Sequence, residues 1–502
     1  MIEPSFAAFA ETYEARGAAL LSTRLVGDLE TPVSAFLKLS AARRGRLFLL
    51  ESVEGGGARG RYSMIGLDPD IVWRCCGDRA EINRRALSDP EAFEPCPEPP
   101  LDSLRALIAE SQIEASEELP PMAAGVFGYL GYDMVRQMER LAPPKPDPIG
   151  VPDAIMLRPT VMVVFDSVKD EIWVVSPVRK AATAKAAYEA GRERIEAIVA
   201  ALEAAQLHDE ETRAAVPTAT PQSNTSEGRF CEMVERAKEY ITAGDIFQVV
   251  LSQRFTAPFT LPAFALYRAL RRVNPAPFLC YLDFGDFQIV CSSPEILVRV
   301  RGAKVTIRPI AGTRWRGKTQ AEDARLAAEL LADEKERAEH LMLLDLGRND
   351  VGRVAKIGSV EVTEQFAIER YSHVMHIVSN VEGRLDARSD AIDALCAGFP
   401  AGTVSGAPKV RAMQIIDELE RDKRGIYAGC IGYFGAHGDM DTCIILRTSV
   451  VKDGLMHVQA GAGVVYDSDP AYEQRECVNK AQALFRAADE AVKFAARAKR
   501  GQ

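Results

Sequence analysis

Two glutamate pairs with the same spacing stand at the starts of two stretches with helical patterning. Glu336 and Glu339 precede the apolar residues 341–344, and Glu473 and Glu476 precede a second helical pattern. Residues three apart lie on one face of a helix, so each pair presents two carboxylates in the same direction. If both helix starts face one cavity, their oxygens suit a hard cation such as Mg²⁺.

A purely structural role explains the same acids. Carboxylates stabilise the positive end of a helix dipole, Asp333 with Glu336 would form a capping box, and Asp469 before Pro470 marks a helix start. A di-iron centre fits less well, because it needs a Glu-x-x-His motif on each of two helices and neither glutamate pair has one. The spacing alone therefore leaves both a metal site and two helix caps open.

Two glycine-rich turns offer backbone N–H groups to an anion. Residues 399–414 run through such a turn into a helix predicted from Pro408, although the phosphate-loop spacing is absent. Gly461 and Gly463 follow a predicted strand, and Arg447 on the preceding predicted strand would add a two-pronged donor for a carboxylate. Glycine-rich hairpins and exposed strand arginines are common, so an ordinary turn remains the alternative.

Composition excludes several classes of protein. The 502 residues, 47% hydrophobic and 26% charged, are enough for two or three globular domains. A net charge of -10 argues against a nucleic-acid binder. We find no signal-peptide pattern and no apolar run of membrane-spanning length. The ten cysteines lack zinc-finger spacing, and Cys430 reads as a buried strand residue, so we expect a reduced, cytoplasmic protein.

Residues 212–228 are rich in Thr, Ser, Pro and Ala and are predicted to be a linker. They divide the chain into residues 1–211 and 229–502. Both parts mix short β-branched runs with amphipathic helical patterns and show no regular β-α-β alternation. This pattern predicts an α+β fold with largely antiparallel strands.

Five segments, taken together, closely resemble the chorismate-utilising enzymes, and the resemblance is greatest to the members that make anthranilate. The segments are residues 309–317, 338–354, 370–383, 400–420 and 461–484. They span nearly all of residues 226–490 in the order typical of that family. The resemblance implies large, mostly antiparallel sheets packed as a sandwich with helices outside, a regulatory region at 1–211 and a catalytic region at 229–502.

The resemblance also implies roles for individual residues. Glu295 matches the family's general acid, which protonates the departing 4-hydroxyl of chorismate as a nucleophile adds at ring position 2; such a carboxyl needs a pKa raised by burial. His376 and Thr403 are the other implied catalytic residues. The implied substrate-binding residues are Thr313, Tyr427, Arg447, Ala460, Gly461, Gly463 and Lys480. The implied Mg²⁺ ligands are Glu336, Glu339, Glu473 and Glu476.

Two positions bear on the nucleophile. Aminodeoxychorismate synthases carry a lysine where this chain has Ala311, and isochorismate and salicylate enzymes carry a water-activating lysine where it has Gln248. Ammonia is then the expected nucleophile, giving anthranilate and pyruvate in the first committed step of tryptophan synthesis. A sister chorismate enzyme, or a non-catalytic amino-acid-sensing subunit, remains an alternative; Lys409 and Lys480 lie in helical patterns that the anthranilate-forming members share.

The resemblance further implies partners and an inhibitor. With no glutaminase domain of its own, the chain would receive ammonia from a separate glutamine amidotransferase subunit, in a heterotetramer of two large and two small subunits. Residues 49–66 resemble the family's tryptophan-binding segment, although a strand ending in a polar turn would look the same. The implied inhibitor residues are Glu51, Ser52, Arg61, Asn274, Pro275, Pro277, Leu279 and Cys443. Phe278 and Leu279 replace the more frequent Tyr-Met, which alters the expected pocket shape.

Overall fold

The computed structural model describes most of the chain. It leaves out residues 42, 44, 54–58, 115, 117, 180–181, 206–219, 372–373 and 498–502. Within the described residues, no helix is both long enough and apolar enough to cross a membrane.

Helices and strands both occur throughout the chain, as expected for an α+β fold. The α-helices are α1 (Phe6–Arg16), α2 (Pro32–Ser40), α3 (Pro100–Glu110), α4 (Ala184–Glu203), α5 (Glu227–Thr242), α6 (Ala263–Val273), α7 (Gln320–Ala332), α8 (Glu334–Gly352), α9 (Ala391–Gly398), α10 (Lys409–Leu419) and α11 (Pro470–Arg497). The 3₁₀ helices are η2 (Tyr132–Gln137) and η3 (Gly402–Val404).

The strands are mostly short, and β3 and β7 are the long exceptions. They are β1 (Ala18–Val26), β2 (Leu47–Val53), β3 (Arg59–Cys76), β4 (Arg79–Asn83), β5 (Phe93–Pro95), β6 (Gly125–Leu130), β7 (Ala154–Asp166), β8 (Glu171–Arg179), β9 (Gln222–Ser223), β10 (Gln248–Pro258), β11 (Phe278–Asp283), β12 (Phe287–Ser293), β13 (Ile296–Arg301), β14 (Lys304–Ile307), β15 (Ile310–Trp315), β16 (Glu361–Arg370), β17 (Val374–Arg384), β18 (Gly406–Ala407), β19 (Cys430–Gly435), β20 (Met440–Ile444), β21 (Thr448–Lys452) and β22 (Leu455–Val464).

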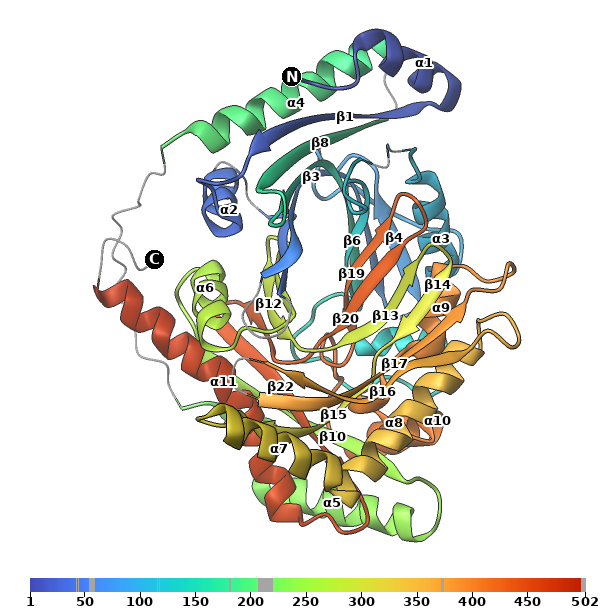
Figure 1. Cartoon of the computed structure of the whole chain (residues 1–502), viewed down its shortest axis with the longest axis vertical. Helices are drawn as coiled ribbons and strands as arrows, with labels where there is room; N and C mark the ends of the chain where they lie inside the picture. The colour runs from blue at the N-terminus through green and yellow to red at the C-terminus, as the bar shows by residue number, and fades with distance from the viewer. Residues whose placement is uncertain are drawn as a thin grey trace.

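All of these strands belong to one antiparallel network that divides into two limbs at the long strands β3 and β7 (Figure 1). One limb runs from β3 through β2, β11, β12, β21 and β22 to β10. The other runs from β7 through β6, β19, β20, β13 and β14 to β17, which β15 and β16 also contact.

The two limbs enclose a hydrophobic core. Phe48 of β2 stacks on Phe127 of β6 with ring centroids 4.9 Å apart, and Leu282 of β11 and Tyr433 of β19 belong to the same buried cluster. Helices cover the outer faces: α4 packs on β8, α11 on β22, and α8 on β15 and β17. Large antiparallel layers with helices outside are therefore confirmed.

The two parts predicted from composition share this network. Strand β2, from the first part, pairs with β11 over the whole length of β11, and β6 pairs with β19. Residues 212–219 of the predicted linker fall outside the described residues. In its described part, Gln222–Ser223 pair with β10 as β9, and Glu227 begins α5. Strands of the N-terminal part therefore pair with strands of the C-terminal part in one sheet network.

Candidate active site

The aspartates at the starts of α8 and α11 cap these helices. Asp333 accepts hydrogen bonds from the backbone N–H groups of Lys335 and Glu336, at 3.1 and 3.2 Å, and Asp469 accepts one from Tyr472 at 2.7 Å. The Glu336 carboxylate does not complete a capping box but lies 3.1 Å from Arg314. Helix capping is therefore a role of Asp333 and Asp469, and it does not account for the glutamate pairs.

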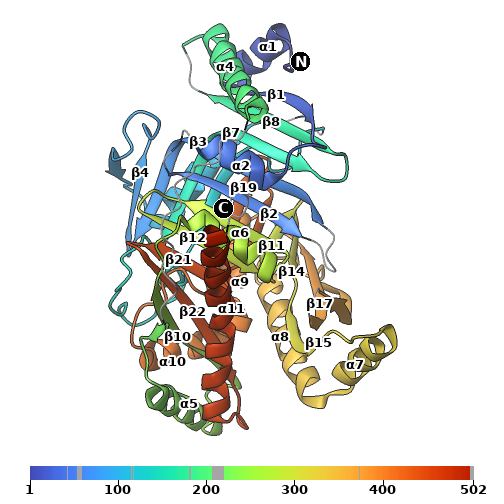
Figure 2. The same ribbon diagram turned by 90° about the vertical axis from the view of Figure 1, so that its left-hand side faces the viewer.

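The two helix starts lie close together. Lys335 Nζ at the start of α8 lies 3.1 Å from Asp467, just before α11, and Figure 2 shows both helices in the lower half of the molecule. Burial, with the charges of Glu336 and Glu476 added, raises the pKa of Glu339. This repulsion across the two helices places their glutamates in one electrostatic cluster.

In the second glutamate pair, Glu476 is ion-paired within its own helix. Burial raises the pKa of Glu473, to which the charge of Glu476 adds. Lys480 Nζ lies 2.6 Å from Glu476 Oε1 and donates to the carbonyl of Gly461 at 3.0 Å. Among the described residues, no three of the four glutamates bring carboxylate oxygens within 4.8 Å of one another.

Glu295 occupies a buried turn between β12 and β13. Its side chain is 6% exposed, and Thr403 Oγ1 of η3 donates to its Oε1 at 3.3 Å. Burial raises the pKa of this carboxyl to about 8, although the hydrogen bond from Thr403 and the charge of Arg447 oppose the rise. The site therefore holds a carboxyl that is largely protonated at neutral pH.

Arg447 lies between β20 and β21, not on a strand as predicted. Its backbone has a left-handed φ of 48°, and its carbonyl accepts a hydrogen bond from the N–H of Ser292 at 3.2 Å. Its guanidinium makes no hydrogen bond or ion pair with any described residue, yet its charge acts on both Glu295 and His376. This arginine is placed to receive an anion next to the buried acid.

His376 of β17 is held in one tautomer. Its Nδ1 lies 2.9 Å from the carbonyl oxygen of Gly312 and 3.1 Å from Thr313 Oγ1 on β15. Because a carbonyl only accepts, Nδ1 carries the proton and the lone pair is on Nε2. Burial lowers the pKa of the ring, so the imidazole is neutral at pH 7.

The other predicted substrate residues meet on β22 and its neighbours. A Cβ atom at Gly461 would lie 2.8 Å from the hydroxyl of Tyr427, and one at Gly463 would lie 2.7 Å from Gln248 Nε2. Only glycine leaves room for these two side chains. Ala460, next to them on β22, is buried and opposes Gln253 of β10.

The lysines that sister chemistries would need are missing from the site. Gln248 Nε2 donates to Glu339 Oε1 at 3.3 Å, while its buried Oε1 has no partner among the described residues. Ala311 lies on β15 two residues before Thr313. Lys409 is 9% exposed and lies 2.9 Å from Asp350 Oδ2, so its ammonium group is bound in a buried ion pair.

The predicted inhibitor residues are divided between two faces of the sheet. Glu51 is 5% exposed and receives two hydrogen bonds from Arg271 of α6, at 2.8 and 3.0 Å, and one from Tyr267. A cavity next to it is lined by Glu51, Ser52 and Arg271. Cys443 instead belongs to the core between the limbs.

The remaining predicted inhibitor residues do not line this cavity. Arg61 does not line the cavity but pairs at 2.9 Å with Asp166, which does. Asn274, Pro275, Pro277 and Leu279 form the connection from α6 into β11. Sequence reasoning missed Arg271 and Tyr267; their spacing of four on one amphipathic helix was the available signal.

Comparison with known proteins identifies the family of this chain. Residues 73–486 match the sequence model of the chorismate binding enzymes. Anthranilate synthase component 1 of Cereibacter sphaeroides is 56% identical over 499 residues, which is 99% of this chain and 100% of that protein. The chain belongs to the anthranilate synthase component 1 family of chorismate-binding enzymes.

Other members of this anthranilate synthase component 1 family agree in sequence and in fold. The component 1 protein of Pseudomonas putida is 47% identical over 479 residues, covering 93% of this chain and 94% of that protein. The crystal structure of anthranilate synthase component I from Streptococcus pneumoniae matches with a TM-score of 0.76 at 38% identity, covering 92% of this chain and 98% of that chain.

Proposed function

We propose that this chain is the large subunit of an anthranilate synthase, which converts chorismate and ammonia to anthranilate, pyruvate and water. The observation that carries the proposal is the buried acid: Glu295 is largely protonated at neutral pH and lies beside Arg447, whose guanidinium is free of partners among the described residues. Arg447 would bind a carboxylate of chorismate and so bring the ring to Glu295.

In the first step the nitrogen of ammonia bonds to ring carbon 2 and the bond to the 4-hydroxyl breaks. Glu295 gives its proton to that oxygen, which leaves as water, and Thr403 supports the resulting carboxylate through its hydrogen bond. The unpartnered Oε1 of Gln248 is an acceptor for an N–H of ammonia. Because positions 248 and 311 are glutamine and alanine, the chain has no lysine there to activate water or to attack chorismate covalently.

In the second step the proton on ring carbon 2 is removed and the enolpyruvyl C–O bond breaks. The aromatic ring of anthranilate forms, and the three-carbon fragment takes up a proton to become pyruvate. His376 fits the role of base, because it is neutral and its Nε2 lone pair is free of hydrogen bonds from the described residues.

The acidic cluster fits a hard cation by the chemistry of its donors. Glu336, Glu339, Glu473 and Glu476 offer only carboxylate oxygens, and burial, with the charge of the neighbouring glutamates added, raises the pKa of Glu339 and of Glu473. We propose that these four residues hold Mg²⁺, directly or through water, and that Lys480 moves from Glu476 when it binds. When bound, the ion would neutralise the ring carboxylate of chorismate.

Two further parts of the proposal concern partners. The component 1 name of the relatives supports a second component, for which we propose a glutamine amidotransferase that supplies ammonia in a heterotetramer of two subunits of each kind. We also propose feedback inhibition by tryptophan at the cavity lined by Glu51, Ser52 and Arg271. A cytoplasmic location accords with such a biosynthetic role.

One assay tests the proposal. The purified chain is mixed with chorismate, Mg²⁺ and ammonium at alkaline pH, and anthranilate fluorescence is followed with and without tryptophan. We expect a signal that needs Mg²⁺ and ammonium and that tryptophan suppresses. Consumption of chorismate without fluorescence would assign a sister chemistry, and no consumption would favour a sensing subunit.

A further inference from the structure

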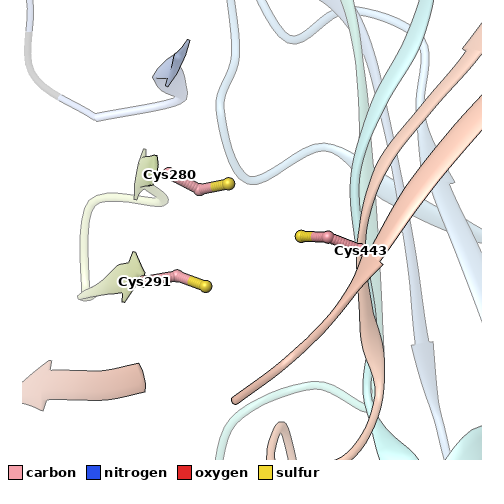
Figure 3. Close-up of side chains that lie close together, drawn as sticks. All are labelled: Cys280, Cys291 and Cys443. Carbon is pink, nitrogen blue, oxygen red and sulfur yellow. The ribbon is translucent and has the colours of Figure 1, made fainter. Parts of the chain in front are cut away.

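Three cysteines from three strands meet in the core between the two limbs. Cys280 of β11 and Cys291 of β12 are directly opposed cross-strand partners, and Cys443 comes from β20 of the other limb. All three are at most 4% exposed, and their Sγ atoms lie within 4.8 Å of one another. Figure 3 shows the sulfurs of Cys280 and Cys291 directed across the core toward that of Cys443.

The size of this cluster suits a single metal ion. Three sulfurs around a central ion with metal–sulfur bonds of about 2.3 Å would stand about 4 Å apart in a trigonal plane. The three sulfurs lie within 4.8 Å of one another, which is compatible with this spacing. Thiolates are soft ligands that select Cu(I), Zn(II) or iron–sulfur clusters.

The number of available ligands distinguishes between these metals. Zn(II) is bound almost always by four ligands in structural sites, whereas the grouping found in the described residues has three cysteines and no nearby His, Asp or Glu ligand atom. The nearby polar group is the carbonyl of Leu446, to which the Cys291 thiol donates at 3.8 Å. We propose that Cys280, Cys291 and Cys443 form a trigonal thiolate site for Cu(I), separate from the acidic cluster.

Binding of the ion requires the three thiols to lose their protons. Cu(I) would replace these protons, including the one that Cys291 donates to the carbonyl of Leu446, and they would pass to solvent. No oxidant or reductant takes part.

The surrounding core would protect a bound ion. Phe127, Ile431 and Tyr433 belong to the same buried cluster, and water and competing ligands are kept out. Binding should therefore be slow in the folded protein but long-lived, with Cu(I) acquired most readily as the chain folds. The cluster also joins the two limbs, so a bound ion would cross-link β11 and β12 to β20.

Metal analysis of the purified chain tests the site. The protein is produced with copper supplied during expression, and a second sample is loaded anaerobically with Cu(I). A chelator then removes loosely held ion before gel filtration. We expect one equivalent of Cu(I) to stay with the folded chain, and Cys280→Ser and Cys443→Ser to lose it. Cys430→Ser is the matched control, because Cys430 is equally buried on the neighbouring strand β19 but lies outside the cluster.

A second measurement needs no variant. The copper X-ray absorption spectrum of the loaded wild-type chain should show three sulfur neighbours and no nitrogen or oxygen ligand. Loss of the ion to the chelator, retention in Cys443→Ser, equal loss in Cys430→Ser, fewer than three sulfurs, or tighter retention of Zn(II) than of Cu(I) would each overturn the proposal. If a serine variant does not fold, the wild-type spectrum and retention still decide.

Discussion

Burial gives Glu295 a property that an exposed glutamate lacks, a carboxyl that keeps its proton near neutral pH. Its pKa is about 8 against an ordinary 4.5. We expect kcat/KM, which reports the free enzyme's essential groups, to fall as pH rises through about 8. Glu295→Gln should abolish this limb and lower the rate of anthranilate release by about 10²–10⁴-fold, because an amide cannot donate the proton.

Stability provides the control for this variant. Between about pH 4.5 and 8 the folded state holds the Glu295 proton that the unfolded state has released, so this residue makes stability fall as pH rises. Glu295→Gln removes that dependence. The free energy of unfolding of the variant relative to wild type, from urea titrations, should therefore increase with pH across this window. An unchanged or decreasing difference would contradict a buried, protonated Glu295.

Glu339 and Glu334 occupy the same helix but differ in surroundings. Glu339 is partly buried and repelled by Glu336 and Glu476, whereas Glu334 is exposed on the first turn. If the acidic cluster holds Mg²⁺, Glu339→Ala should reduce activity by more than the roughly 10–100-fold that outer-shell partners of metal ligands contribute. Glu334→Ala should leave both activity and the Mg²⁺ requirement near the wild type. Near-normal turnover by Glu339→Ala at low Mg²⁺ would reject the metal assignment.

At the scale of elements, strand register connects the proposed inhibitor cavity with the acid. Glu51 of β2 opposes Leu279 of β11, which opposes Ser292 of β12, three residues before Glu295. The Ser292 hydroxyl donates to the carbonyl of Asn274 at 2.5 Å, and its N–H donates to that of Arg447 at 3.2 Å. One residue thus touches both the connection that follows α6 and the proposed substrate arginine.

Ser292→Ala should therefore uncouple inhibition from catalysis. The variant loses the contact with Asn274 but keeps the backbone bond to Arg447, so the tryptophan inhibition constant should rise by about 5-fold or more while kcat changes less. Ser449→Ala is the control, because Ser449 is equally buried on the neighbouring strand β21 and its hydroxyl has no partner among the described residues. An inhibition constant that does not change in Ser292→Ala would remove Ser292 from the coupling.

Local sequence patterns predicted where helices begin, but they did not predict contacts between residues far apart in the chain. The first turns of α8 and α11 were predictable because Asp333, Asp469 and Pro470 are strong start signals. The prediction that Arg447 lies on a strand is wrong: its backbone is left-handed, and its carbonyl is hydrogen-bonded to Ser292 of β12, far away in the sequence. The bonds from Arg271 to Glu51 were likewise invisible, because they join residues 220 positions apart.

At the scale of the whole molecule, the active site depends on the sheet that both parts of the chain build. Composition suggested a boundary near residues 212–228, but pairing between distant strands cannot be read from composition. Removal of residues 1–205 would expose the edge of β11 that pairs with β2 and the edge of β19 that pairs with β6. It would also open the core where Phe48 and Phe127 stack.

We therefore expect residues 220–502 expressed alone to be insoluble or inactive, although they contain every residue proposed for catalysis. Expressed together with residues 1–205 as a second chain, they should assemble and recover chorismate turnover, because the strand pairs and the core do not require the connection between the parts. Co-purification, circular dichroism and anthranilate fluorescence measure this. A stable, active 220–502 fragment would show that the N-terminal strands are dispensable for positioning Glu295. It would also show that the C-terminal part folds as an independent domain.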